Sequence, residues 1–104
     1  MHDGALRFEY DLRPLPLGRF TFRRWRWELW RGAVLRASGW RTTPFDAQRA
    51  LRTAASYWAH DEIGLTPIRP EHSRARDRFV PGATVRIDCG AVACVLLPRG
   101  AAEA

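Results

Sequence analysis

A single amphipathic helix, predicted over residues 44–62, limits the folds that are open to this chain. Thr43 can cap its first turn, Pro44 suits the first helical position, and Asp46 stands where a carboxylate can reach back to the cap. Apolar residues then recur at helical spacing, at Ala47, Ala50, Leu51, Ala54, Ala55 and Trp58. We expect this stripe to lie close against a sheet, and we expect Gly64 to end the helix. The face turned to water is then formed by Gln48, Arg49, Arg52 and Ser56.

Alternation of apolar and charged side chains predicts a strand on the N-terminal side of the helix. Over residues 5–13, the apolar side chains that would share one face are Leu6, Phe8, Tyr10 and Leu12. A repeat of two over this length indicates a strand with one buried face. Pro14 and Pro16 end it, because proline cannot donate a hydrogen bond to a neighbouring strand.

A second strand, predicted over residues 19–30, has aromatic residues in two phases. The first phase holds Phe20 and Phe22, and the second holds Trp25 and Trp27. A β-bulge at Arg23 and Arg24, which lie between the two phases, would bring all of these rings to one face, and we expect it there. The alternative is a strand that carries aromatic rings on both faces, one of them exposed.

The rest of the chain supplies a third strand, a long loop and a closing hairpin. The third strand is expected over residues 33–41, after a tight turn at Arg31–Gly32. Residues 65–82 form a long connection, and such connections are usually functional or disordered. Its arginines are Arg69, Arg74, Arg76 and Arg78. Residues 83–98 then predict a hairpin, and residues 99–104 are expected to form a frayed tail.

The predicted order of elements is βββαββ, which describes one α+β domain over residues 1–104. A mainly antiparallel sheet would carry the one long helix on one of its faces. A chain of 104 residues can bury about 65% of the surface that its unfolded form exposes, so a single core is feasible. The closing hairpin would present a free edge, through which two copies could pair as a homodimer.

Neither export nor membrane insertion is predicted. Residues 1–4 contain no basic region followed by an apolar run, as a secretory signal would have, and the longest apolar runs are too short to span a bilayer. The expected compartment is the cytoplasm, where Cys89 and Cys94 are expected to be reduced, half-buried thiols. A disulfide between them is the alternative if the two face each other across a hairpin.

No residue pattern predicts an enzyme, a metal site or a bound cofactor. The sequence lacks the GxSxG, GxxxxGK[ST] and GxGxxG motifs. His60, Asp61 and Glu62 are neighbours, but successive helical residues point about 100° apart, so these side chains diverge. We expect a binding protein without catalytic residues, in which His60 near the helix C-terminus favours its protonated form.

The positive charge points to an acidic partner. The net charge is +6, and all 17 basic residues are arginine. Clustered cations bind nucleic acid by releasing counterions from its phosphates. Lysine and asparagine, whose codons are rich in A, are both absent, which indicates a very GC-rich genome and accounts for part of the arginine content. The charge therefore supports nucleic-acid binding less strongly than its size suggests.

Arginines and aromatic residues alternate along the second predicted strand. Such a strand can follow phosphates while its rings stack on bases, and a β-ribbon can enter the major groove of DNA. A small domain also needs large side chains in its core, and Trp25 and Trp27 are expected there, opposite Trp58. Trp30 and Trp40 are then the aromatic residues that we expect to be exposed.

Residues 19–60 resemble two kinds of small module. The residues that carry the resemblance are Trp25-Arg26-Trp27-Glu28-Leu29, Gly32-Ala33-Val34-Leu35, Ser38-Gly39-Trp40, Thr43, Asp46-Ala47 and Ala50. They are similar to the three-strand-and-helix arm-binding domains of tyrosine recombinases and to small actinobacterial modules with a W-x-W strand and an alanine-rich helix. In the recombinase domains the sheet lies in the major groove, and the resemblance would place there Arg24, Arg26, Arg36 and Arg41. The chain lacks the Gly/Lys-rich first hairpin of those domains, and its closing hairpin has no counterpart in them.

Two functions follow as hypotheses. The first is nucleic-acid binding, with DNA favoured over RNA, through the outer face of the sheet and the arginine-rich loop. The second is protein interaction, as an accessory subunit or as an inhibitor of phage or mobile-element type that covers an acidic or other protein surface. The residues expected to contact either partner are Arg24, Arg26, Trp30, Arg36, Trp40, Arg41, Arg69, Arg74, Arg76 and Arg78. The long arginine loop slightly favours phosphate as the ligand.

Overall fold

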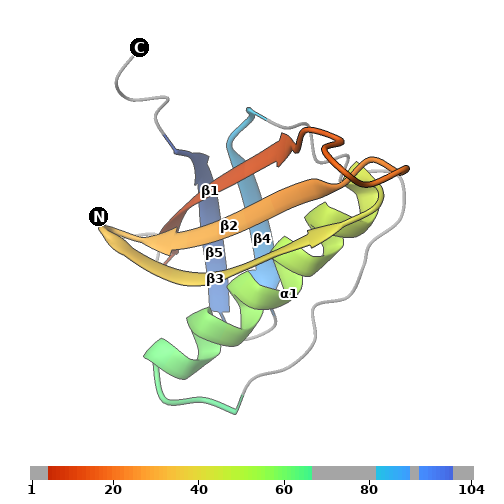
Figure 1. Ribbon diagram of the computed structural model, residues 1–104. Coiled ribbons are helices and arrows are strands. Elements are labelled where there is room, and N and C mark those ends of the chain that lie inside the picture. Colours follow the sequence, from red (N-terminus) through yellow and green to blue (C-terminus); the bar gives the residue numbers. More distant parts are fainter. Residues whose placement is uncertain (1–4, 67–81, 90–91, 100–104) are drawn as a thin grey trace.

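The fold consists of one sheet and one helix (Figure 1). The computed structural model describes residues 5–66, 82–89 and 92–99. Its elements are β1 (Leu6–Pro14), β2 (Trp25–Arg31), β3 (Val34–Arg41), α1 (Pro44–Glu62), β4 (Val85–Cys89) and β5 (Val92–Pro98). Their order confirms the predicted α+β class and the βββαββ succession. In this described part of the chain, no helix is long and apolar enough to cross a membrane.

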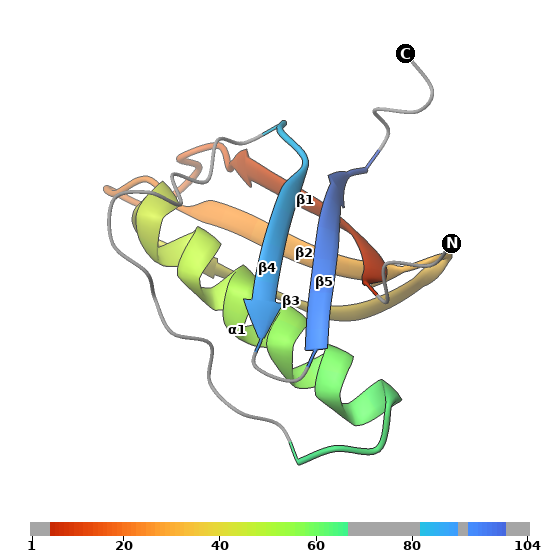
Figure 2. The ribbon, with the colours of Figure 1, turned by 180° about the vertical axis from the view of Figure 1, so that it is seen from behind.

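The strands form a mixed sheet in the order β3-β2-β1-β5-β4. The pairs β1–β2, β2–β3 and β4–β5 are antiparallel, as predicted for most of the sheet. β1 and β5 run parallel, with Leu6 opposite Cys94 and Tyr10 opposite Pro98. A parallel pair needs a crossover connection, and the chain that includes α1 provides it. In both Figure 1 and Figure 2, β4 and β5 cross the direction of β2 and β3 steeply, so the sheet is strongly twisted.

The core lies between the sheet and α1, which packs on β1, β2, β3 and β5 (Figure 2). The alternation predicted for β1 is confirmed, since Phe8, Tyr10 and Leu12 are buried. Trp27 of β2 is buried among them. Trp25 and Trp58 are partly buried and pack against this core, as predicted. The remaining core residues are Leu29, Ala47, Leu51, Ala55, Ala59, Ile87, Cys94 and Leu96.

Two glycines shape the hairpin of β2 and β3. Gly32 has a φ of +60°, which favours glycine, and it forms the turn with Ala33, one residue later than predicted. Gly39 stands opposite Trp27 in the register. A Cβ atom at Gly39 would lie 3.0 Å from the Trp27 Nε1 atom, so the indole occupies the space of a side chain. Glycine at this position therefore lets Trp27 approach the β3 backbone.

β2 is shorter than predicted and begins at Trp25. Its pairing with β1 stops where Pro14 lies opposite Trp25, and the residues before Trp25 belong to the loop between the two strands. The bulge predicted at Arg23–Arg24 is therefore wrong, because both residues lie in the loop, before the strand begins. The register of β2 against β3 is instead irregular between Leu29 and Trp30.

Both ends of α1 match the predicted signals. The Thr43 hydroxyl oxygen accepts a hydrogen bond of 3.0 Å from the Asp46 backbone N–H, and Pro44 is the first helical residue. At the other end, Gly64 has a φ of +77° and its N–H donates to the Asp61 carbonyl at 3.1 Å. The helix therefore ends in a glycine-terminated turn of the expected kind.

The buried face of α1 is rotated from the predicted one. Gln48, Arg52 and Ser56, which were expected to face water, are buried, whereas Arg49 is exposed as predicted. The buried residues form two rows with a spacing of four: Ala47, Leu51, Ala55 and Ala59, and then Gln48, Arg52, Ser56 and His60. Because α1 packs on four strands of a twisted sheet, the covered strip is wider than the apolar stripe.

β4 and β5 form the predicted closing hairpin. Its register places Cys94 opposite Ile87 and Cys89 opposite Val92, so the two cysteines do not stand directly across from each other. Cys94 is fully buried in the core, and not half-buried as expected.

Two predicted segments extend beyond the described residues. In the long loop, the arginines Arg69, Arg74, Arg76 and Arg78 lie outside the described part of the chain. Residues 100–104 of the predicted tail also lie outside it. Arg99 was predicted to belong to that tail, but it is held in place. Its backbone N–H donates to the Tyr10 carbonyl at 2.8 Å, and its Nη1 donates to the Gly32 carbonyl at 3.1 Å.

Candidate functional site

The loop between β1 and β2, residues 15–24, is braced by hydrogen bonds within its own backbone. At its base, the Leu15 N–H donates to the Arg24 carbonyl at 2.9 Å. At its tip, the Phe20 N–H donates to the Leu17 carbonyl at 2.9 Å. These two hydrogen bonds hold the loop backbone in a defined shape, and this backbone positions the aromatic side chains of the loop.

Three aromatic rings and one guanidinium group gather where this loop meets β3. The ring centroids of Phe20 and Phe22 are 5.5 Å apart at 63°, and those of Phe22 and Trp40 are 6.2 Å apart at 31°. The Arg24 guanidinium carbon lies 4.0 Å from the Phe20 centroid and 5.8 Å from the Trp40 centroid. Arg24 Nη2 also donates to the Pro16 carbonyl at 3.1 Å. We name Phe20, Phe22, Arg24 and Trp40 the aromatic–arginine corner.

The aromatic–arginine corner exposes much of its ring surface. Phe20 is 37% exposed, while Phe22 and Trp40 are each 42% exposed. Leu17, at the tip of the same loop, is 45% exposed. Contiguous exposed apolar side chains commonly mark an interaction surface, whereas single exposed ones do not. The prediction that Trp40 is exposed is confirmed, and the two phenylalanines extend its surface.

Among the residues that the structure describes, no carboxylate pairs with the arginines of this region. Arg19 and Arg23 are exposed in the loop, and Arg41 follows Trp40 at the end of β3. Arg41 Nη1 donates to the Trp40 carbonyl at 2.8 Å. Within the described residues, the ion pairs involve neither these three arginines nor Arg24. Their charges therefore add up to a local positive potential beside the exposed rings.

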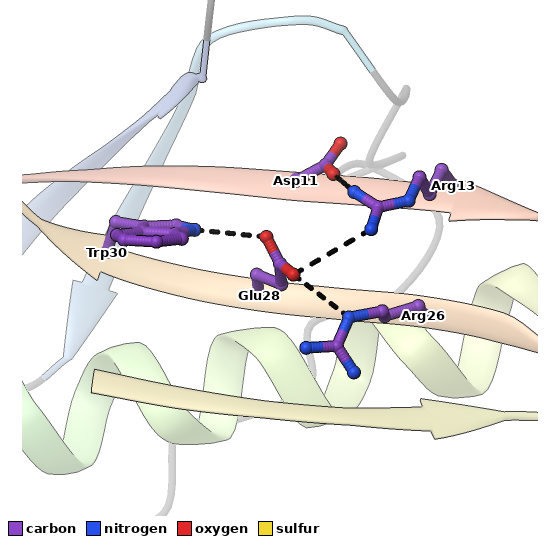
Figure 3. A network of polar contacts seen from close by, with 5 residues as sticks. All are labelled: Asp11, Arg13, Arg26, Glu28 and Trp30. Carbon is purple, nitrogen blue, oxygen red and sulfur yellow. Dashed lines mark hydrogen bonds and ion pairs between the residues drawn. The ribbon is translucent and has the colours of Figure 1, made fainter. Parts of the chain in front are cut away.

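The middle of the outer sheet face, which points away from α1, holds a polar network around Glu28 (Figure 3). Arg26 Nε donates to Glu28 Oε2 at 2.9 Å, and Trp30 Nε1 donates to Glu28 Oε1 at 3.1 Å. Arg13 Nη2 lies 3.9 Å from Glu28 Oε2, and Arg13 also forms an ion pair with Asp11. Two predicted contact residues, Arg26 and Trp30, are thus bound within the protein.

The network keeps Glu28 ionised. Burial by itself raises the pKa of this carboxyl group. The hydrogen bonds from Arg26 and Trp30, together with the charges of Arg26 and Arg13, outweigh burial and hold the pKa of Glu28 below its ordinary value of 4.5. At neutral pH the centre of the outer face therefore carries a negative charge among its arginines.

The ring of Trp30 is covered by another side chain. The Arg99 guanidinium carbon lies 3.8 Å from the centroid of the Trp30 ring. Arg99 Nη1 also lies 3.6 Å from a carboxylate oxygen of Glu9. With Arg99 on its ring and Glu28 on its N–H, Trp30 is less open to a partner than predicted.

The structure divides the predicted contact residues into separate places. Arg24, Trp40 and Arg41 come together at the aromatic–arginine corner, and Arg26 and Trp30 belong to the network around Glu28. Arg36 lies apart from both, with its guanidinium carbon 5.1 Å from the ring centroid of Trp58 on α1. The four loop arginines, Arg69, Arg74, Arg76 and Arg78, lie outside the described residues.

Sequence reasoning missed Phe20 and Phe22 as surface residues. It placed them in a strand, on one face with the core tryptophans or, as the alternative, on a second and exposed face, because they alternate with polar residues. Gly18, which has a φ of +57°, lies just before them and follows two prolines, so the turn extends further than the prolines alone suggest. That glycine was the available sign that these rings belong to a loop.

The described residues contain no group of three histidine, cysteine, aspartate or glutamate side chains that could hold a metal ion. His60 is buried, and its Nδ1 lies 2.7 Å from the Ser56 carbonyl oxygen. A carbonyl oxygen only accepts hydrogen bonds, so this contact requires a proton on Nδ1. The His60 imidazole is therefore engaged in a hydrogen bond within α1.

No protein family, curated protein or solved structure matches this chain. The resemblance of residues 19–60 to recombinase arm-binding domains stays a prediction.

Proposed function

We propose that this protein is a nucleic-acid-binding module whose contact surface is the aromatic–arginine corner. The observation that carries the proposal is the placement of three exposed rings beside arginines that have no carboxylate partner among the described residues. Aromatic rings stack on bases, and arginines neutralise phosphates and release their counterions. The corner offers both groups within one small surface.

This contact surface is smaller than the whole sheet face expected from the sequence. Arg26 and Trp30 are bound to Glu28, and Arg99 covers the ring of Trp30. A ligand on the middle of the face would have to break these contacts. The proposed contact residues are therefore Arg24, Trp40 and Arg41, joined by the loop arginines Arg19 and Arg23 in place of Arg26 and Trp30.

A protein partner is the second candidate, because exposed tryptophan and arginine also dominate protein hot spots. The charge of the corner favours nucleic acid over an ordinary protein surface, since no carboxylate in the described part of the chain pairs with its arginines. Only a strongly acidic protein surface would match it equally well.

Fluorescence anisotropy tests the proposal, with labelled duplex DNA, single-stranded DNA and RNA at low and near-physiological salt. We expect micromolar or tighter binding of at least one of these, weakened steeply by salt. Replacing Arg23 by alanine should weaken binding and lower the salt slope by about 1. Arg36→Ala is the matched control, because it removes the same charge beside Trp58, away from the corner.

Two results would contradict the proposal. The first is no binding of any nucleic acid at low salt, which would turn the search to a protein partner. The second is an equal effect of Arg23→Ala and Arg36→Ala, which would assign the binding to overall charge and not to the corner.

A further inference from the structure

We infer that the ligand of the aromatic–arginine corner is an unpaired nucleic-acid strand, whose bases stack on Phe22 and Trp40. This inference rests on the proposed function and adds the state of the ligand, a single strand in place of a duplex. Single-stranded DNA and RNA share the chemistry that matters here, which is open base faces on a charged backbone.

The exposed aromatic residues favour an unpaired strand. Phe22 and Trp40 are each 42% exposed, and their ring planes differ by only 31°. In a duplex, each base is covered on both faces by its neighbours and shows only its edges in the grooves. Exposed rings can stack on a base face without unstacking a base step only where the strand is unpaired.

Arg24 prepares this surface in advance. Its guanidinium group lies on the Phe20 ring at 4.0 Å and hydrogen-bonds to the Pro16 carbonyl at 3.1 Å. Phe20 in turn contacts Phe22, which contacts Trp40. A surface that is already assembled loses little side-chain freedom on binding. Arg24 is thus a positioning residue, while Arg19, Arg23 and Arg41 remain open to phosphates.

The charge of the sheet face disfavours a duplex. Glu9, Asp11 and Glu28 lie on this face, and each is engaged with an arginine. Entry of the face into the major groove would bring three carboxylates close to the phosphates and remove their water. The corner arginines have no such carboxylate within ion-pair distance in the described chain. A strand that follows the corner alone leaves these ion pairs in water and meets only the arginines.

Competition between single strands and duplexes tests the inference. The probes are short fluorescein-labelled oligothymidine and oligouridine strands, each free and annealed to its complement, at one low salt concentration. We expect the free strands to bind at least about tenfold more tightly than the duplexes. Trp40→Leu and Phe22→Leu should each weaken single-strand binding by about tenfold.

The matched control is Tyr57→Leu, which removes a 49% exposed ring from α1, outside the corner, and should leave binding unchanged. Circular dichroism of each variant checks that the fold is kept. Equal or tighter binding of the duplexes, or unchanged single-strand binding by both folded corner variants, would overturn the inference while the proposed function stands. Absence of binding to every probe would overturn both.

Discussion

At the level of single residues, Glu28 decides which side chains of the outer sheet face can reach a partner. It accepts hydrogen bonds from Arg26 and Trp30, and Arg13 lies within ion-pair distance of it. Its side chain is only 13% exposed, so these contacts are partly shielded from water. Trp40 has no hydrogen bond to this network and remains open beside the corner arginines.

Replacing Glu28 by glutamine should lower the free energy of unfolding at pH 7 by about 1–2 kcal/mol, because a charged acceptor is lost. The pKa of Glu28 is lower in the folded protein than its ordinary 4.5. Its contribution is therefore full above that pH and is lost as the pH falls through the lowered pKa. Urea unfolding across this pH range should show the difference between the two proteins shrinking towards acid.

Asp61→Asn, at an exposed carboxylate near the end of α1, is the control for this substitution and should behave like the unchanged protein. A difference between Glu28→Gln and the unchanged protein that stays constant from neutral to acid pH would contradict the account of this network.

The sequence predicts whether a tryptophan is exposed only where no residue from a distant part of the chain covers it. Trp40 was expected on the surface and is 42% exposed. Trp30 was expected there for the same reason, but Arg99 from the far end of the chain lies on its ring. A contact between such distant residues depends on how β5 is placed in the sheet, which alternation within β2 does not reveal.

At the level of elements, α1 shows what periodicity can and cannot predict. The caps at Thr43 and Gly64 depend on local chemistry, and the predicted ends agree with the structure. The apolar stripe was also identified, but a row of polar residues beside it is buried too. The width of the covered strip depends on the twisted sheet against which the helix packs, and this sheet forms only in the folded chain.

Ser56, fully buried on α1, provides the test of this rotated face. Ser56→Glu should lower the free energy of unfolding by about 3 kcal/mol or more, because the carboxylate would lose its water and the longer side chain would have to fit at a fully buried position. Arg49→Glu, on the exposed face of the same helix, is the control and should change stability little. Chemical denaturation measures both, and equal stabilities would show that the face containing Ser56 is open to water, as the sequence pattern first suggested.

The loop of residues 15–24 is the second element whose nature was not evident from local pattern. Its phenylalanines alternate with polar residues as strand residues do, yet β1 pairs with β2 only as far as Pro14. The prolines and Gly18 indicate the turn but not how far it extends. Most of the candidate site therefore had to come from the structure.

At the level of the whole molecule, the central position of β1 organises the fold. The hairpin of β2 and β3 follows from neighbouring strands and a short turn, and it was predicted from the sequence. The parallel pairing of β1 with β5 was not, because it joins opposite ends of the chain. Tyr10 of β1 adds a contact to the residues just before β4, since its hydroxyl donates to the Ala83 carbonyl at 2.6 Å and accepts from the Gly82 N–H at 3.0 Å.

Tyr10→Phe should therefore destabilise the protein by about 1–2 kcal/mol and speed amide hydrogen exchange in β4. Burial raises the pKa of Tyr10 above 10.0, despite its hydrogen bonds to Gly82 and Ala83, so the neutral hydroxyl is favoured in the fold. That contribution is lost as the pH rises through the raised pKa, and the difference between the two proteins should narrow there. Tyr57→Phe, at an exposed hydroxyl, is the control, and equal exchange in both variants would contradict this role of Tyr10.

The most direct test of the aromatic–arginine corner is a proton–nitrogen NMR titration that follows the indole N–H signals of the five tryptophans. Adding a short oligothymidine strand should shift the signal of Trp40, identified by its loss in Trp40→Phe, and leave that of the buried Trp27 in place. A shift of Trp30 without one of Trp40 would move the contact to the middle of the sheet face and contradict the account. Unchanged signals throughout would show that the corner does not bind nucleic acid.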